Sequence, residues 1–317
     1  MNTGAPQDIT MKTGVLLLTH GTVDDLGDLR VFLTNIRRGH APPEALVQEM
    51  AHRYEVIGGR SPLNEITARL AKKVECALSM PVRFAARLWR PTVDQQLGEL
   101  VAAGASRVVL VPMAQFSSLI YCEHAKTRAQ VAGLSKVEFV SVPDWGSDDC
   151  LHHAFVHRAR THLATLPQDG SKVRILVTAH SLPMAVIRAG DAYEREFRRA
   201  ADRFAAALLP LVDSCRVVFQ SQGQSLGPGG KPAEWLGPDL PSAIAEAKAD
   251  GVTHLVFAPL GFLADHVEIL YDLDIEARAL AQAAGLSVSR TASLNDDDDL
   301  VRVVEGLVLR ALQDASP

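Results

Sequence analysis

The sequence is poor in cysteine, and its cysteines do not form local pairs. Cys76, Cys122, Cys150 and Cys215 lie far apart in the chain, whereas structural zinc sites and iron–sulfur loops use ligands that are close together in sequence. A disulfide framework is typical of small secreted domains rather than of a chain of 317 residues. We therefore expect free thiols in a reducing cytoplasm and no iron–sulfur cluster.

Long apolar runs and an excess of basic charge are also missing. No apolar stretch approaches the roughly 20 residues that span a bilayer. The polar start of the chain, Met1–Lys12, lacks the basic and apolar regions of a secretory signal. The formal net charge of −5 gives no support to nucleic-acid binding. These absences predict a cytoplasmic protein without a nucleic-acid partner, which touches a membrane surface at most.

The sequence does contain a regular alternation of short apolar segments and longer segments of helical period. This alternation is typical of parallel sheets with helices on both faces, and continuous apolar strands fit burial on both sides. The predicted fold class is therefore α/β. The expected strands are residues 13–19, 82–88, 107–112, 137–142, 173–178, 216–220, 253–259 and 286–290, and the expected helices include 62–80, 93–103, 194–208, 242–249, 266–284 and 300–312.

Two pairs of segments resemble one another. Val15–Gly21 (VLLLTHG) and Ile175–Ser181 (ILVTAHS) are both apolar strands that end in a histidine and a small residue. Ala102–Phe116 and Ala249–Phe262 share the order of glycine, strand, proline and phenylalanine. Such repetition indicates two similar Rossmann-like halves, each a parallel sheet flanked by helices.

The expected halves are residues 12–150 and 151–317, in line with a prior of roughly 150 residues per domain. Ligands of open α/β sheets bind beyond the carboxyl ends of the strands, so we expect one cleft between the halves, with His20 and His180 facing it. A histidine in that position can ligate a metal or accept a proton near neutral pH. The alternative is a structural histidine held by hydrogen bonds.

Three acids, Glu268, Asp272 and Glu276, follow one another at intervals of four residues. On an α-helix they would form one acidic stripe, and like charges at this spacing destabilise a helix. The stripe therefore favours a compensating cation, because carboxylates are suitable ligands for divalent ions. A solvated acidic face is the alternative, although the apolar neighbours of the stripe argue against full exposure.

Arginines collect in the first part of the chain, at Arg37, Arg53 and Arg60, the last of which precedes Ser61. A guanidinium group binds a carboxylate through two parallel hydrogen bonds. Several such groups around one cleft would suit a substrate with several carboxylates. Scattered surface arginines are the alternative.

Together these segments resemble the ferrochelatase family. The resemblance extends from about Val15 to Glu276 and rests, in the family's order, on LLLTHGTVDDLGDLRVFLTNIRRG, RYEVIGGRSPLNEIT, TAHSLP, VVFQSQG, EWLGPD and PLGFLADHVEILYDLDIE. It implies a chelatase-like pair of Rossmann-like halves around a porphyrin, and the insertion of Fe²⁺ in haem biosynthesis. Porphyrin and Fe²⁺ are then the substrates, haem is the product, and no permanently bound cofactor is expected. Transient contact with other enzymes of the haem pathway is a further expectation.

The resemblance also implies roles for individual residues. His180 matches the family's histidine that accepts pyrrole protons or binds iron, and Glu268 matches its partner carboxylate, so these two are the expected catalytic residues. Asp272 and Glu276 match outer acids that hold a metal. The expected metal ligands are thus His20, His180, Glu268, Asp272 and Glu276, and the expected porphyrin-binding residues are His20, Arg37, Arg53, Tyr54, Ser61 and His124.

The N-terminal third is most similar to the compact form of Gram-positive bacteria, which acts on coproporphyrin III. That form has tyrosines where this sequence has His20 and His124, which leaves coproporphyrin III and protoporphyrin IX both open as substrates. Two other functions are alternatives. The LLTHG segment around His20 is similar to the metal-binding histidine of sirohydrochlorin and cobalt chelatases, and His20 could also ligate haem in a non-catalytic haem-binding or delivery protein.

Overall fold

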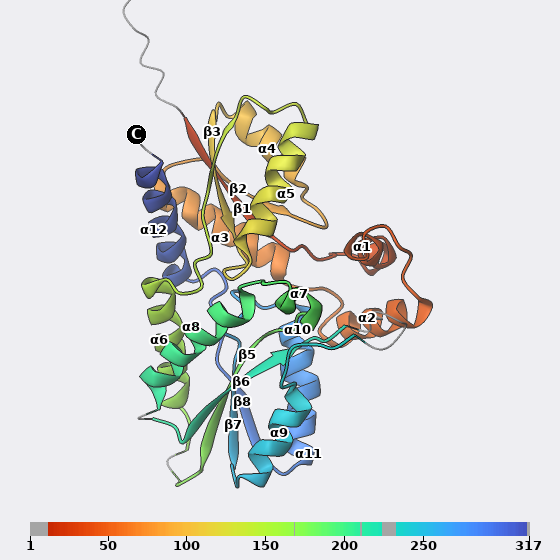
Figure 1. Ribbon diagram of the computed structural model, residues 1–317, viewed down its shortest axis with the longest axis vertical. Coiled ribbons are helices and arrows are strands. Elements are labelled where there is room, and N and C mark those ends of the chain that lie inside the picture. The colour runs from red at the N-terminus through yellow and green to blue at the C-terminus, as the bar shows by residue number, and fades with distance from the viewer. Residues whose placement is uncertain (1–11, 168, 210, 224–232, 316–317) are drawn as a thin grey trace, which may run out of the picture.

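The computed structural model describes residues 12–167, 169–209, 211–223 and 233–315, and it contains two parallel sheets of four strands each (Figure 1). The polar start of the chain before Lys12 lies outside the described residues. The first sheet, in the order β2-β1-β3-β4, and the second, in the order β6-β5-β7-β8, have equivalent topologies. The strands are β1 (Thr13–Thr19), β2 (Val82–Ala86), β3 (Arg107–Pro112), β4 (Glu138–Ser141), β5 (Val173–His180), β6 (Ser214–Gln220), β7 (His254–Ala258) and β8 (Ser287–Arg290).

The α/β class and the two Rossmann-like halves are confirmed, and the internal repeats have a structural cause. The central pairs β1–β3 and β5–β7 are parallel, with Leu18 opposite Pro112 and Val177 opposite Ala258. β1 and β5 are buried along almost their whole length, as expected for strands covered on both faces. His20 follows the last residue of β1 and His180 is the last residue of β5, so the two histidines lie at equivalent edges of their sheets.

The helices of the first half owe their positions to apolar faces. In α3, for example, Ile66, Leu70 and Val74 recur at intervals of four residues and are all buried. α1 and α2 extend away from the first sheet (Figure 1) and pack on each other and on Val267 and Tyr271 of the second half. These helices are α1 (Leu29–Ile36), α2 (Glu44–Val56), α3 (Leu63–Leu78), α4 (Val93–Ala102) and α5 (Ser118–Val131), preceded by a 3-10 turn, η1 (Leu26–Asp28).

In the second half, the expectation of one regular helix over residues 266–284 is wrong. The segment divides into α10 (Val267–Leu270), a π-helix, η3 (Asp272–Ala277), and α11 (Arg278–Ala283). The backbone N–H of Glu276 reaches the carbonyl of Tyr271, five residues earlier, at 2.9 Å. The remaining helices are α6 (Asp149–Leu163), α7 (Met184–Arg188), α8 (Tyr193–Leu208), α9 (Leu240–Ala249) and α12 (Asp298–Asp314).

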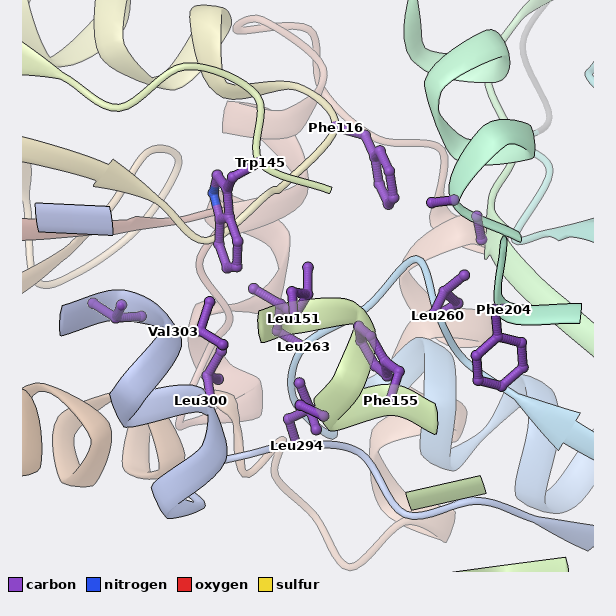
Figure 2. Packing of buried hydrophobic residues seen from close by; sticks show 14 of the residues in the cluster. Phe116, Trp145, Leu151, Phe155, Phe204, Leu260, Leu263, Leu294, Leu300 and Val303 are labelled. Atoms are coloured by element: carbon purple, nitrogen blue, oxygen red, sulfur yellow. The ribbon is translucent and has the colours of Figure 1, made fainter. Parts of the chain in front are cut away.

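One buried core joins the two halves. Figure 2 shows side chains from both halves, among them Trp145, Phe155, Leu300 and Val303, and all four belong to one apolar cluster. α12 packs on α3, β3 and β4 of the first half as well as on α6. The division into residues 12–150 and 151–317 stays a proposal. α12 lies in the second range of residues but packs on elements of both ranges. No helix among the described residues is long and apolar enough to cross a membrane.

Candidate active site

A cavity of about 360 Å³ lies between the two halves, within the size range of small-molecule sites. Its walls include the residues directly after β1 and β3, the last residue of β5 and the loop from Gly261 that follows β7, so it lies at the carboxyl ends of both sheets. The expected cleft is therefore present. Most of the wall is apolar, and it includes Phe32, Ile36, Met50, Leu63, Ile66, Leu70, Phe116, Tyr121, Leu182, Tyr193, Phe262 and Leu263.

Two glycines allow the chain to pass closely around this cavity. Gly21 has a φ of +101°, and a Cβ atom there would lie only 2.9 Å from the Cβ of Ala86. A Cβ atom on Gly261 would lie 2.5 Å from the Cβ of Ala179. Glycine is needed at both positions because any side chain would collide with the neighbouring strand. The close packing places His20 and the loop before Glu268 at the cavity.

His180 and Glu268 face each other at the cavity wall. His180 Nε2 lies 3.6 Å from Glu268 Oε1, and both residues line the cavity. His180 Nδ1 is hydrogen bonded to the carbonyl of Ser181. A carbonyl only accepts, so Nδ1 carries the proton and the lone pair of a neutral ring is on Nε2. This nitrogen is thus oriented as a base toward the cavity.

The carboxylate of Glu268 lies between two histidines. His266 Nε2 is 3.8 Å from the second oxygen, Oε2, and His266 Nδ1 donates to the carbonyl of Ala264 at 3.0 Å. The side-chain amide of Gln220 donates to the backbone carbonyl of Glu268 at 2.9 Å. Sequence reasoning missed His266, although it is only two residues before Glu268 in the same segment.

These contacts determine the charge of the site. Burial opposes ionisation of Glu268, but His180, His266 and His20 together hold its pKa well below its usual range. Burial would lower the pKa of His266, yet the hydrogen bond and charge of Glu268 raise it. The site therefore presents a half-buried, ionised carboxylate to the cavity.

His20 is open to the cavity while protein surrounds it on the other sides. Burial, and then the positive charges of His180, Arg87 and His266, lower its pKa to about 4, although Glu268 acts in the opposite sense. His20 is thus neutral at pH 7 and has a lone pair for a metal. Within the described ranges no three histidine, cysteine or acidic side chains are close enough to hold a metal ion, so the expected ligands do not form a preassembled metal centre.

Asp272 and Glu276, the other two predicted metal ligands, differ in burial. Asp272 is buried; its Oδ1 accepts a hydrogen bond from Arg53 Nη1 at 3.0 Å and its Oδ2 accepts one from Ser221 Oγ at 2.5 Å. Burial and the charge of Glu268 raise the pKa of Asp272 to about 6, against the opposing effects of Ser221 and Arg53. Glu276 is exposed. The three predicted acids thus run from the exposed Glu276 to Glu268 at the cavity. The middle acid, Asp272, is paired with a guanidinium group.

The predicted porphyrin-binding residues are only partly at the cavity. Tyr54 lines it, as His20 does, and its hydroxyl is hydrogen bonded to Thr22 Oγ1 at 2.7 Å. Arg37 is exposed at the end of α1, Ser61 is buried before α3, and His124 is half-buried on α5. The described residues that line the cavity include neither these three nor Arg53.

Arg87 is a candidate that sequence reasoning missed. Its guanidinium carbon lies 5.7 Å from the centre of the Tyr121 ring, and its charge acts on His20 and His124. Its Nε is buried without a hydrogen-bond partner, and the described part of the chain offers it no ion pair. Arg87 is not among the described residues that line the cavity, but its neighbour Tyr121 is. A guanidinium without an ion pair in this position is a candidate partner for a carboxylate of a substrate that extends beyond the cavity wall. The only sequence signal is its position directly after β2, equivalent to that of His20 after β1.

Comparisons with known proteins bear on the family and the fold of the chain. A family model described as Ferrochelatase matches residues 12–312. The ferrochelatase of Acidobacterium capsulatum is 32% identical over 316 residues, which cover 95% of each chain. The coproporphyrin III ferrochelatase of Frankia alni is 32% identical and matches 96% of this chain and 81% of its own. SirB from Bacillus subtilis, solved with Fe³⁺, aligns with a TM-score of 0.58 at 15% identity over 95% of this chain and 96% of that chain, which is a similarity of fold.

Proposed function

This chain belongs to the ferrochelatase family, and on that premise we propose that its cleft takes coproporphyrin III and that His180 and Glu268 carry out the chemistry. The protein is accordingly an enzyme that inserts Fe²⁺ into a porphyrin to form haem. The observation that carries the assignment of residues is the pair of His180 Nε2 and Glu268 Oε1, 3.6 Å apart at the wall of an apolar cavity between the halves.

The reaction requires a base, because the porphyrin loses its two pyrrole N–H protons as Fe²⁺ enters. His180 is suited to accept these protons one at a time, since its Nδ1 is fixed on the Ser181 carbonyl and its Nε2 points to the cavity. Its side chain is partly exposed, so it would release the first proton to solvent before it takes the second. The ionised carboxylate of Glu268 stabilises the imidazolium that forms. It also attracts Fe²⁺, and the second histidine, His266, keeps it ionised while the proton moves.

The shape and polarity of the cavity suit a porphyrin. Apolar side chains such as Met50, Ile66 and Phe262 line it, and they would bury the faces of the ring and exclude water from the reacting nitrogens. The unpaired guanidinium of Arg87 and the exposed Arg37 offer positive charge to the propionates. We propose coproporphyrin III because it carries twice as many carboxylates as protoporphyrin IX, and because relatives such as the Frankia alni protein bear its name.

We further propose that Fe²⁺ is a passing substrate and that no iron–sulfur cluster is bound. In support, the four cysteines lie far apart in the chain, whereas iron–sulfur loops use cysteines that are close together in sequence, and they range from exposed (Cys76 and Cys150) to buried (Cys122). Free thiols also support the proposal that the protein works in the cytoplasm. Transient contact with other haem-pathway enzymes or with a membrane surface remains a prediction.

The test is anaerobic insertion of Fe²⁺ by the purified chain, followed by absorbance with coproporphyrin III and protoporphyrin IX in parallel. We expect kcat/KM to be at least about tenfold higher for coproporphyrin III. Protoporphyrin IX has fewer carboxylates, and the loss of one charge-assisted hydrogen bond to a carboxylate lowers kcat/KM by about this factor. Faster turnover of protoporphyrin IX would contradict the proposed substrate. Turnover of neither ring, together with tight haem binding that is lost in His20→Ala, would support the haem-binding alternative.

A further inference from the structure

The peptide group that joins His180 to Ser181 is hydrogen bonded at both of its ends. The hydroxyl of Tyr193 donates to the carbonyl of His180 at 2.9 Å. The N–H of Ser181 donates to the carbonyl of Gln220, on the neighbouring strand β6, at 2.7 Å. The carbonyl and the N–H of a trans peptide group point in opposite directions, so a rotation of the group would break both bonds. The backbone that carries the imidazole of His180 is therefore fixed.

Ser181 fixes the next peptide group as well. It is fully buried, and its Oγ donates to the carbonyl of Leu236 at 2.7 Å. The N–H of Leu236 donates in turn to the carbonyl of Leu182 at 2.9 Å. Between these two bonds lies the carbonyl of Ser181, which accepts the proton of His180 Nδ1. The EWLGPD segment around Leu236 thus holds the carbonyl group that orients the imidazole.

Tyr193 is itself held in place and remains a donor. It is buried at the start of α8 and lines the cavity. Its ring meets that of Phe116, from the first half, edge to face, with the centres 6.3 Å apart and the planes at 88°. Burial and the charge of Glu268 raise the pKa of the Tyr193 hydroxyl above its usual range. The hydroxyl therefore keeps its proton at every pH at which iron insertion is measured.

We propose that Tyr193 and Ser181 are positioning residues for the base of the reaction: together they hold the ring of His180 in the tautomer whose Nε2 lone pair faces the cavity. The inference rests on the proposed function, because it takes His180 as the base. A neutral imidazole carries its proton on either nitrogen. If the Ser181 carbonyl turned away, the proton would be free to move to Nε2, and the ring would then present a hydrogen to the pyrrole nitrogens instead of a lone pair.

The experiment reads the tautomer from the ¹⁵N chemical shifts of the two His180 ring nitrogens in protein labelled with ¹⁵N-histidine. Spectra are recorded at about pH 8.5, where an ordinary histidine is neutral, and His180→Gln identifies the signals. We expect the proton on Nδ1 in the unsubstituted chain. Tyr193→Phe and Ser181→Ala each remove one hydroxyl. In both we expect the tautomer ratio to move toward Nε2–H by roughly 2- to 10-fold, the effect of one neutral hydrogen bond.

Kinetics distinguish positioning of the base from binding of the ring. Tyr193→Phe keeps the aromatic contact with Phe116, so we expect KM for coproporphyrin III to change less than threefold. We expect kcat to fall by roughly tenfold, since a misplacement of about 1 Å costs up to about 100-fold. Thr165→Val is the matched control, because the exposed Thr165 Oγ1 also donates to a histidine carbonyl, that of His162, at 2.7 Å. It should leave kcat, KM and the His180 shifts unchanged, and circular dichroism checks the fold of each variant.

A proton on Nε2 of His180 in the unsubstituted chain would overturn the inference without any variant. So would unchanged His180 shifts in both Tyr193→Phe and Ser181→Ala, or a Tyr193→Phe protein that loses activity through KM alone, because Tyr193 would then only shape the pocket. Failure of the proposed function is a separate result, because it is read from Fe²⁺ insertion. A chain that inserts Fe²⁺ at a normal rate with the proton on Nε2 would keep its proposed function, and only the positioning role of the two hydroxyls would be refuted.

Discussion

His180 Nε2 lies 3.6 Å from Glu268 Oε1, although the two residues come from the end of β5 and from α10, which are far apart in the chain. Metal insertion requires a base for the pyrrole protons and an anionic group for the metal, and this pair can supply one of each. The imidazole has its lone pair toward the cavity, because the Ser181 carbonyl holds the opposite nitrogen. The carboxylate has neither a lysine nor an arginine partner in the described part of the chain, and only histidines approach its two oxygens.

Replacing either member of this pair should abolish most of the activity. We expect His180→Ala and Glu268→Gln each to lower kcat for Fe²⁺ insertion by roughly 10²- to 10⁴-fold, the usual contribution of a general base. The measurement is anaerobic kinetics, with thermal unfolding as a check on the fold. His153→Ala is the matched control, because His153 is exposed on α6, and it should keep full activity. A kcat within threefold of normal in either active-site variant would refute its role.

His266 should lower the pH at which Glu268 takes up a proton. Its contact with Oε2 is one of the causes that lower the pKa of Glu268, against the effect of burial. His266→Asn removes that positive charge, so the pKa of Glu268 should rise toward its usual range and the protonated carboxyl should form at a higher pH. The measurement is the infrared absorbance of the protonated carboxyl as the pH falls from about 7 to 3, with the same protein carrying Glu268→Gln as the reference. A carboxyl that is protonated at the same pH or a lower one in His266→Asn would show that His266 does not hold Glu268 ionised.

The strands and the edge at which the ligand binds could be predicted from the sequence because they depend on local pattern. β1 and β3 have the predicted bounds, since continuous apolar runs fix parallel strands. The same reasoning placed His20 and His180 at one cleft, because both follow strands whose carboxyl ends meet there. Glu268 followed from its position in the segment after β7.

The remaining features depend on packing between distant segments, which periodicity does not report. Asp272 and Glu276 have the spacing of an α-helical stripe, but a π-helix begins at Asp272 and needs only six residues, too few for the pattern to distinguish the two helices. Arg53 pairs with an acid 219 residues away, and the sequence contains no sign of that partner. Arg87 and Tyr121 come together because β2 ends close to the first turn of α5.

The stability of the protein should report the unusual state of Asp272. Its pKa is raised from 3.8 to about 6 in the folded protein, so the proton binds the folded state more tightly than the unfolded one. The resulting stability is fully present below about pH 4 and is lost as the pH rises through 6. Relative to Asp272→Asn, the free energy of unfolding of the unsubstituted protein should therefore fall by about 2–3 kcal/mol between pH 4 and 7.

Urea unfolding at a series of pH values, with a chelator present, measures this difference. The pH dependence is the informative quantity, because the loss of the contact with Arg53 adds a constant offset. Asp298→Asn is the matched control, since the side chain of Asp298 is 76% exposed, and its stability should parallel that of the unsubstituted protein. A difference that does not change with pH, or that grows as the pH rises, would mean that Asp272 keeps an ordinary pKa.

Arg87 should determine how tightly the substrate's carboxylates bind without taking part in the chemistry. Its guanidinium is beside Tyr121 and acts on His20 and His124, yet it has no ion pair among the described residues and its Nε lacks a partner. A propionate would supply that partner, and a charge-assisted hydrogen bond contributes about 1.5–3 kcal/mol. We therefore expect Arg87→Leu to raise KM for coproporphyrin III by roughly 10- to 100-fold with kcat changed less than threefold.

Arg87→Lys should recover part of the lost affinity, because it keeps the charge but not the two parallel donors of the guanidinium group, while Arg302→Leu should leave KM unchanged, because Arg302 is an exposed arginine on α12 that pairs with Asp299. If Arg87→Leu instead lowered kcat at unchanged KM, Arg87 would act on the reacting nitrogens and not on the propionates.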